Sequence, residues 1–488
     1  MKRVTGLLPI LVLILLCIPG CEAKEPTVLN SVEDLEGKTV GTQEGCLYEQ
    51  GLTERNIEVN LQFFSDPTNE IEAVKQKKID AFLTEDVTYN AFIKHVDGYK
   101  LIEQPVAEYE TAIGVGKTKN ETLLLSQMNE FIAKSKEDGT LDQLYKYWIE
   151  EFNEDTCKME TGTFSGENGT IKIAYEGAFQ PYSYIKDNEL IGYDIDFICR
   201  FCRAYGYKPE FLDMAYDAIP AALTSGKCEF GTNIIVSKER SNSDIALSEC
   251  YVVQKIYACF YTGVESKNGT SIADSFQKTF MKENRWKLFA DGLKTTIIIV
   301  VFSILLGTFL GYLIYLFCRN RPVAAKVFGI FQWILQGVPT VLFLMILYYL
   351  VFKNVSNGIY VAIIGFTILF TSAMYSMIEN GVKSVGVGQL EAARAQGFSD
   401  FGAFRYIIMP QAIQHFLPLY KDNVISILKE SSIVGYIAIE DLTKMGDMVR
   451  ARTFEAFFPL IATALIYFAV IVALIALVNL VQKKMIQM

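Results

Sequence analysis

The sequence predicts a two-part protein, in which a mixed α/β half precedes an all-α membrane half. The chain has 488 residues, enough for two or three domains, and 51% of them are hydrophobic. The apolar residues are unevenly placed, because long apolar runs fall within residues 291–488. Before these runs, strand-like stretches such as 39–42 and 80–83 alternate with helical stretches such as 69–77 and 123–136. That alternation is typical of α/β folds.

The first 23 residues have the features of a secretory signal. Lys2 and Arg3 precede a ten-residue apolar run, 7–16, which is too short to span a bilayer comfortably. The exit around Cys21 fits either a lipoprotein cleavage box, with Cys21 lipidated, or ordinary cleavage. Both alternatives predict that the residues that follow are exported.

Composition argues against several classes of function. The net charge is −10, and an acidic surface disfavours a nucleic-acid partner. The two histidines lie far apart, and the ten cysteines show no metal-site rhythm, so we expect neither a metal site nor catalytic residues. Residues 114–118 look like the end of a phosphate-binding loop but lack its earlier glycine, so we expect no cofactor in this chain.

A polar stretch at 388–418, between apolar runs, has the composition of a docking loop. It contains Glu-Ala-Ala, then a glycine, then Ile-x-Met-Pro. Small alanines let another surface approach, and the glycine permits a sharp exit from a helix. The plain alternative is an ordinary loop between membrane helices. The docking reading assigns this role to Glu391, Ala392, Ala393, Arg394 and Gly397.

This stretch resembles the cytoplasmic coupling loop of ABC importer permeases, with Met409 in place of the usual leucine. A second signature of that family, Gly-x-Pro, occurs as Gly337-Val338-Pro339. Residues 291–488 therefore resemble the permease subunit of polar amino-acid ABC importers, of the histidine/glutamine permease type. The resemblance implies that two ATPase subunits, which bind ATP and Mg²⁺, hold the 391–397 turn, and that a second, identical permease chain completes a homodimer.

Five apolar segments are expected to cross the membrane, after an amphipathic connector at 267–290 that would lie on the bilayer surface. The segments are about 294–317, 328–351, 359–377, 412–439 and 458–481. Charged and amide residues interrupt the fourth segment. Because charge at bilayer depth is costly, Asn423, Lys429 and Glu430 are candidates for the translocation path or the subunit seam. The alternative is a shorter span with solvated ends.

The basic residues predict the orientation. Arg319, Arg394 and Lys483 lie in loops or a tail that five spans place on one face, which the positive-inside rule makes cytoplasmic. Arg450 and Arg452, on the opposite face, weaken this bias. We therefore expect a multi-pass protein of the plasma membrane, with the coupling loop inside and the α/β half outside.

The α/β half resembles the periplasmic amino-acid-binding proteins, in which two α/β lobes close on a ligand, but its pieces come in an altered order. Residues 31–103 resemble lobe two, and 104–154 return to lobe one and end in the family's C-terminal helix. A linker, 155–170, precedes lobe one at 171–250 and a crossover strand at 251–266. The hypothesis is one circularly permuted domain, 24–266, since permutation at exposed loops preserves packed contacts. The alternative is two half-domains completed by a neighbouring protomer.

Matching positions to that family proposes the ligand site. Arg240 would hold the α-carboxylate, because a guanidinium presents a planar fork of donors. Glu85 would bind the α-ammonium, where the family normally has aspartate, and Phe179 would stack on the ligand. Further positions at the matched site are Glu176, Tyr182, Thr232, Asn233 and Cys46. Each also has a structural explanation, as an exposed arginine, a core aromatic or a surface acid.

Together these resemblances imply a fused solute-binding and permease subunit of an ABC importer that takes up polar amino acids. It would be a transporter subunit and not an enzyme, with ATP hydrolysed by its partner chains. The alternative is a ligand-gated channel or membrane-bound amino-acid sensor, which needs no docking loop. The sequence does not identify the amino acid.

Overall fold

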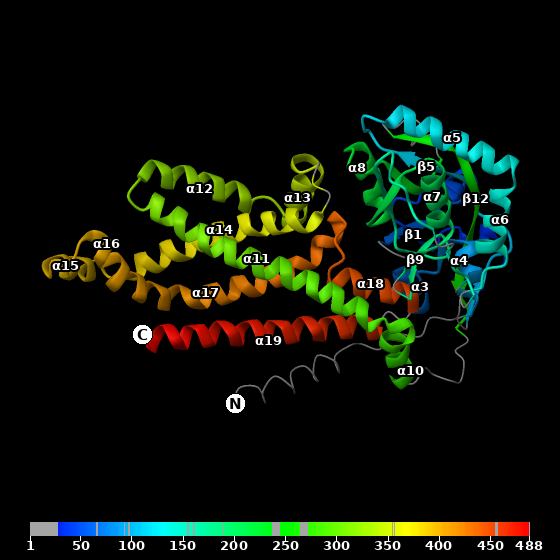
Figure 1. Ribbon diagram of the computed structural model, residues 1–488. Coiled ribbons are helices and arrows are strands. Elements are labelled where there is room, and N and C mark those ends of the chain that lie inside the picture. The colour runs from blue at the N-terminus through cyan, green and yellow to red at the C-terminus, as the bar shows by residue number, and fades with distance from the viewer. Residues whose placement is uncertain are drawn as a thin grey trace.

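The computed structural model separates an α/β domain from an elongated bundle of helices (Figure 1). It describes residues 28–64, 67–91, 93–95, 98–153, 156–159, 162–187, 189–236, 245–263, 272–353, 355, 357–453 and 457–487. The α/β domain caps one end of the bundle, and the C-terminus lies toward the other end (Figure 1).

One large sheet organises the α/β domain. In the described part of the chain it has nine strands in the order β10-β6-β11-β5-β12-β3-β1-β2, with β4 paired to β12. The strands are β1 (Thr39–Gln43), β2 (Asn60–Phe64), β3 (Ala81–Glu85), β4 (Tyr99–Leu101), β5 (Ala107–Val115), β6 (Thr170–Tyr175), β10 (Lys208–Asp213), β11 (Phe230–Ile235) and β12 (Ala246–Tyr261). A smaller sheet holds β7 (Ala178–Phe179), β8 (Ser183–Lys186) and β9 (Glu189–Ile191).

Two long antiparallel strands join the lobes. β5 and β12 pair from Val115↔Ala246 to Ala107↔Ile256, and β12 then continues into lobe two by pairing with β3. We call the part of the domain with β6, β10 and β11 lobe one, and the part with β1, β2 and β3 lobe two. The crossover strand starts at Ala246, earlier than the predicted 251. Strands of a single chain thus complete the described sheet.

Helices flank the sheet and enclose aromatic cores. They are α2 (Gln50–Glu54), α3 (Pro67–Lys75), α4 (Asp86–Ala91), α5 (Glu121–Glu137), α6 (Thr140–Tyr145), α7 (Tyr193–Ala204) and α8 (Ile219–Thr224). Just after α6, the fully buried Trp148 donates a hydrogen bond from its indole nitrogen to Asp196 of α7, at 3.1 Å. This contact ties the segment resembling the family's C-terminal helix to the lobe that resembles its N-terminus.

The bundle is built on long apolar helices. Its elements are α10 (Ile272–Phe276), α11 (Trp286–Cys318), α12 (Pro322–Gln336), α13 (Thr340–Met345), α14 (Gly358–Ser384), α15 (Val387–Ala395), α16 (Asp400–Ala403), α17 (Met409–Glu430), α18 (Leu442–Thr453) and α19 (Phe457–Gln487). α11 and α14 pack closely at Gly307 and Gly311, which have no side chain. A Cβ at either position would clash with Phe370 or Met374 of α14. Small residues are what allow such helix contacts in membranes.

The five expected spans are matched in part, because the described residues hold up to four candidate spans when a bent pair of helices counts as one. Among the described residues, three helices are long and apolar enough to cross a bilayer: α11, α14 and residues Phe458–Leu480 of α19. The predicted second segment is instead a pair, Pro322–Gln336 and Thr340–Val351, bent by 105°. It breaks at Gly337-Val338-Pro339, where proline cannot continue the helix ladder. α11 begins at Trp286, within the predicted connector.

Lobe one rests on the bundle through a buried lysine. Lys227, which follows α8, points its ammonium group at the carbonyl oxygens of Tyr348, Phe352 and Val355, at 3.4, 3.2 and 2.7 Å. The same nitrogen lies 3.6 Å from the ring centre of Tyr348. Burial lowers the pKa of Lys227 to about 8. The residues after α13 therefore dock against the α/β domain at its bundle-facing side.

Candidate functional site

The candidate ligand site is a cluster of buried polar side chains where the two lobes meet. Glu85 ends β3 and is 3% exposed. Its carboxylate accepts hydrogen bonds from the hydroxyl groups of Tyr48 and of Thr88, the latter at 2.9 Å. Burial raises the pKa of Glu85, against the opposing effect of those hydrogen bonds. A buried carboxylate with two donors is a ready acceptor for a cationic group.

A direct hydrogen bond crosses between the lobes beside it. Gln43, at the end of β1, donates from Nε2 to Oε1 of Glu176, which follows β6, at 2.7 Å. Cys46 is buried, and its Sγ lies 3.6 Å from Oε1 of Gln43. Burial raises the pKa of the Cys46 thiol, and the nearby Glu176 and Glu85 carboxylates raise it further. Three of the predicted residues therefore share one cluster although they come from three distant segments.

Aromatic rings form a wall next to these acids. Phe179 and Tyr182 stack, with ring centres 4.9 Å apart and planes inclined by 19°. Tyr182 is fully buried, and its hydroxyl oxygen has no hydrogen-bond partner among the described residues. The Glu85 carboxylate is close enough to raise the pKa of Tyr182, after burial itself. A flat aromatic wall beside a carboxylate suits an ammonium-bearing ligand.

The predicted Thr232 and Asn233 lie on β11 in lobe one and are both buried. Asn233 has a left-handed backbone, with φ of 58°, and its Oδ1 accepts from Nε2 of Gln254 at 3.0 Å. Its backbone nitrogen donates to the hydroxyl of Tyr251, at 3.3 Å. That hydroxyl in turn donates to Asp194, at 2.6 Å. Burial raises the pKa of Asp194 to about 7, so this carboxyl group changes its protonation state close to neutral pH.

Sequence reasoning missed the residues that support these groups. Gln43, Tyr48 and Gln254 are single polar residues with no motif around them, and only their inward position reveals them. The sequence does hold one indication for Gln254: its neighbours on the same face of β12, Val252 and Ile256, are apolar, so the amide stands out. Arg240, the predicted carboxylate ligand, lies outside the described residues.

The predicted coupling loop is an exposed helical turn. α15 ends in a Schellman arrangement, in which Phe398 N–H donates to the Ala393 carbonyl at 3.1 Å and Gly397 N–H to that of Arg394 at 2.9 Å. Gly397 has φ of 86°, a conformation that favours glycine. Glu391, Ala392 and Arg394 are exposed, whereas Ala393 is buried. α15 and α16 lie at the end of the bundle far from the α/β domain (Figure 1).

A cavity with mixed polar and apolar lining opens next to the helix break. Its volume is about 310 Å³, and its lining includes Asn423 and Glu430 of α17 together with Gln336, Ser372 and Ser426. Thr340, the first residue of α13, donates to Glu430 Oε2 at 3.1 Å. Lys429, the third predicted residue of this group, is exposed and does not line the cavity. The start of α13 therefore presents a hydroxyl group to the Glu430 carboxylate in this cavity.

The chain joins an α/β domain with a buried polar cluster to long apolar helices, and an exposed turn lies at the opposite end of these helices. This arrangement is that of a membrane transport subunit that carries its own receptor domain. The comparisons with known proteins agree. The family "Binding-protein-dependent transport system inner membrane component" matches residues 303–487, and "Bacterial extracellular solute-binding proteins, family 3" matches residues 171–287.

The similar proteins include two permeases and one solved transporter. The probable glutamine ABC transporter permease protein GlnP of Bacillus subtilis is 31% identical over 189 residues, which cover 37% of this chain and 85% of that protein. The putative glutamine transport system permease of Rickettsia bellii is 29% identical over 201 residues, covering 40% and 89%. A solved amino acid ABC transporter with histidines is 27% identical, covers 44% of this chain and 100% of that chain, and has a TM-score of 0.39.

The chain belongs to the ABC transporter permease family. It is a fused solute-binding and permease subunit, a transporter component and not an enzyme, which confirms the function class predicted from its motifs.

Proposed function

We propose that this subunit imports an amino acid, captured outside the cell between its two lobes and passed through its own membrane helices. The observation that carries the proposal is the cluster of Glu85, Glu176 and the stacked Phe179–Tyr182 pair at the lobe junction. Glu85 would bind the α-ammonium group, and Arg240 the α-carboxylate. Glu176 would contact the ligand side chain, and Thr232, Asn233 and Cys46 are further residues of the proposed site. Two buried carboxylates favour a ligand that brings positive or polar groups.

The binding domain is proposed to be circularly permuted and complete within one chain. The match to the solute-binding family begins at 171, one residue into β6, which supports a start of the family-like segment after the linker. Pairing of β12 with both β5 and β3 supports closure within one chain. The Trp148–Asp196 contact supports the junction of the former termini. The proposed lobe segments keep the boundaries 31–103, 104–154, 171–250 and 251–266, although the strand β12 itself begins at Ala246.

The membrane half is proposed to cross the bilayer five times, counting the bent pair as one span and α17 as another. This count puts the α/β domain outside, in the plasma membrane, and the 391–397 turn inside. Two ATPase subunits carrying ATP and Mg²⁺ would bind Glu391, Ala392, Ala393, Arg394 and Gly397. A second copy of the chain would complete the pore. The cavity beside Asn423 and Glu430 would form part of the translocation path.

Calorimetric titration of the full chain in detergent with each of the twenty amino acids tests the ligand. We expect saturable binding of at least one, and its loss in Glu85→Gln. If none binds, the proposed ligand class is wrong. Uptake into liposomes should require the ATPase subunits and ATP. Ligand-dependent flux without them would support the channel alternative instead.

A further inference from the structure

α18 of the membrane half contacts both lobes of the binding domain at once. It packs against α11 and α19 in the bundle, and also against β7 and β8 of lobe one and α3 of lobe two. In Figure 1 it lies between the bundle and the α/β domain. Three cationic side chains of α18 make polar contacts with its surroundings: Lys444, Arg450 and Arg452, which are 17%, 8% and 7% exposed.

Lys444 holds the loop that carries the ligand-site acid. Its ammonium group lies 3.2 Å from Oδ1 of Asp213, whose side chain is fully buried at the end of β10. The same Asp213 oxygen accepts a hydrogen bond from the backbone nitrogen of Gly177, at 2.9 Å. Gly177 directly follows Glu176, so a permease lysine is two contacts from the hydrogen bond between Glu176 and Gln43.

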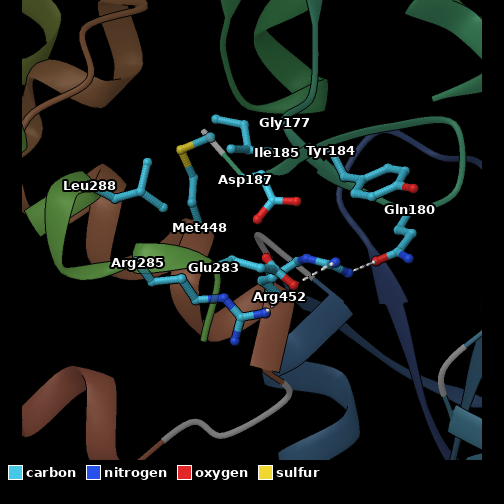
Figure 2. Close-up of a pocket in the computed structure, with 11 residues that line it drawn as sticks. Gly177, Gln180, Tyr184, Ile185, Asp187, Glu283, Arg285, Leu288, Met448 and Arg452 are labelled. Atoms are coloured by element: carbon cyan, nitrogen blue, oxygen red, sulfur yellow. Dashed lines mark hydrogen bonds and ion pairs between the residues drawn. The ribbon is translucent and has the colours of Figure 1, made fainter. Parts of the chain in front are cut away.

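Arg452 holds the other end of the same loop. Its guanidinium donates to the side-chain oxygen of Gln180 and pairs with Glu283 at 3.2 Å, as Figure 2 shows. It also lies 5.1 Å from the ring centre of Tyr184. Glu283 is itself held by Arg285, at 3.1 Å, and adopts a left-handed backbone with φ of 56°. Residues 176–184, which include Phe179 and Tyr182, are thereby fastened to α18 at two points.

Arg450 makes the corresponding contact with lobe two. Its Nη2 donates to Oδ1 of Asn69 in α3, at 2.6 Å, while Nη1 pairs with Asp447 of its own helix at 2.8 Å. Arg450 and Arg452 are two residues apart on one helix, yet they hold opposite lobes. Separation of the lobes must therefore break one of these sets of contacts or move α18. Lys444 and Asp213 form a buried ion pair, and Arg450 and Arg452 donate charged hydrogen bonds to Asn69 and Gln180. Leaving a buried charged group without its partner is unfavourable, so each contact resists opening.

We propose that α18 is a clamp between the lobes, in which Lys444, Arg450 and Arg452 act as positioning residues that link closure of the ligand site to the arrangement of the membrane helices. The proposal rests on the proposed function, in which the lobes close on an amino acid. Such linkage is reciprocal: if closure positions α18, then a change in α18 must alter ligand affinity.

The test measures the lobe separation directly, in the full chain. Spin labels on cysteines introduced at Lys208 and Gln62, exposed residues on the edge strands β10 and β2, report the distance between lobes. We expect Lys444→Met with Arg450→Met to shift the ligand-free distance distribution to longer values. Lys294→Met, which removes an exposed cation of α11, is the matched control and should leave it unchanged.

Amino-acid affinity, measured for single and double variants, is the second test. The double variant should weaken amino-acid binding by about 5- to 150-fold, the usual range of coupling between sites. Lys444→Met and Asp213→Asn should not add in a double-mutant cycle, because both remove one contact. Distances and affinities equal to those of Lys294→Met would overturn the clamp. If the unmodified chain binds no amino acid, the proposed function fails, whereas the distance measurement still decides the clamp.

Discussion

Replacing Gly397 by alanine isolates the contribution of one backbone conformation to ATPase docking. The residue has φ of 86°, and a Cβ built there would meet no atom within 4 Å. The substitution therefore introduces no clash, and its whole cost is the left-handed strain of an L-residue. That strain is about 1–2 kcal/mol, which corresponds to about a 5- to 30-fold loss in the population of the turn.

Gly388 is the matched control, because it also faces open space but lies inside α15 without a positive φ. Alanine there should be neutral or should favour the helix by up to about 1 kcal/mol. Titration of the ATPase subunit onto the full chain in nanodiscs measures the difference. We expect about 5- to 30-fold weaker association for Gly397→Ala alone, with amino-acid binding unchanged. Equal association for the two variants would refute a docking role for this turn.

Three further predictions concern the ligand site and the pore. Glu85→Gln should weaken amino-acid binding by about 10- to 100-fold, since a charge-assisted bond is replaced by a neutral one; unchanged calorimetric affinity would contradict the assignment. Because the pKa of Asp194 is about 7 when folded, above its unfolded value, the folded state keeps a proton that the unfolded state loses. Thermal stability of the α/β domain should therefore fall as pH rises from about 4 to about 7, and Asp194→Asn should flatten this profile. Glu430→Gln should slow uptake about tenfold or more while leaving ligand binding intact, because it removes the charge from the bundle cavity; normal uptake would exclude Glu430 from the path.

Some of the candidate site was predictable because short sequence signatures surround it. Glu85 ends a buried strand, and Glu176, Phe179 and Tyr182 follow another, so their positions could be matched without knowing which strands pair. The structure brings these residues to one junction. Tyr48 could not be predicted, because its role depends on a fold that brings its hydroxyl to Glu85 from 37 residues away.

The membrane half was likewise predictable from the sequence only in part. Apolar length predicted α11, α14 and α19, since a bilayer selects for long apolar helices. The motif Gly337-Val338-Pro339 was recognised, but not the 105° bend, because a proline breaks hydrogen bonds without specifying where the next helix goes.

The sequence by itself determined the features whose causes are local: which segments are apolar, and that Gly397 permits a sharp exit from a helix. The tertiary structure alone decided what the outer cations do. Arg450 and Arg452 only weakened the charge bias used to predict orientation, yet they hold opposite lobes of the binding domain. The reason is physical: a charge is satisfied by whichever surface reaches it, and Asn69 and Gln180 lie 381 and 272 residues away in the chain.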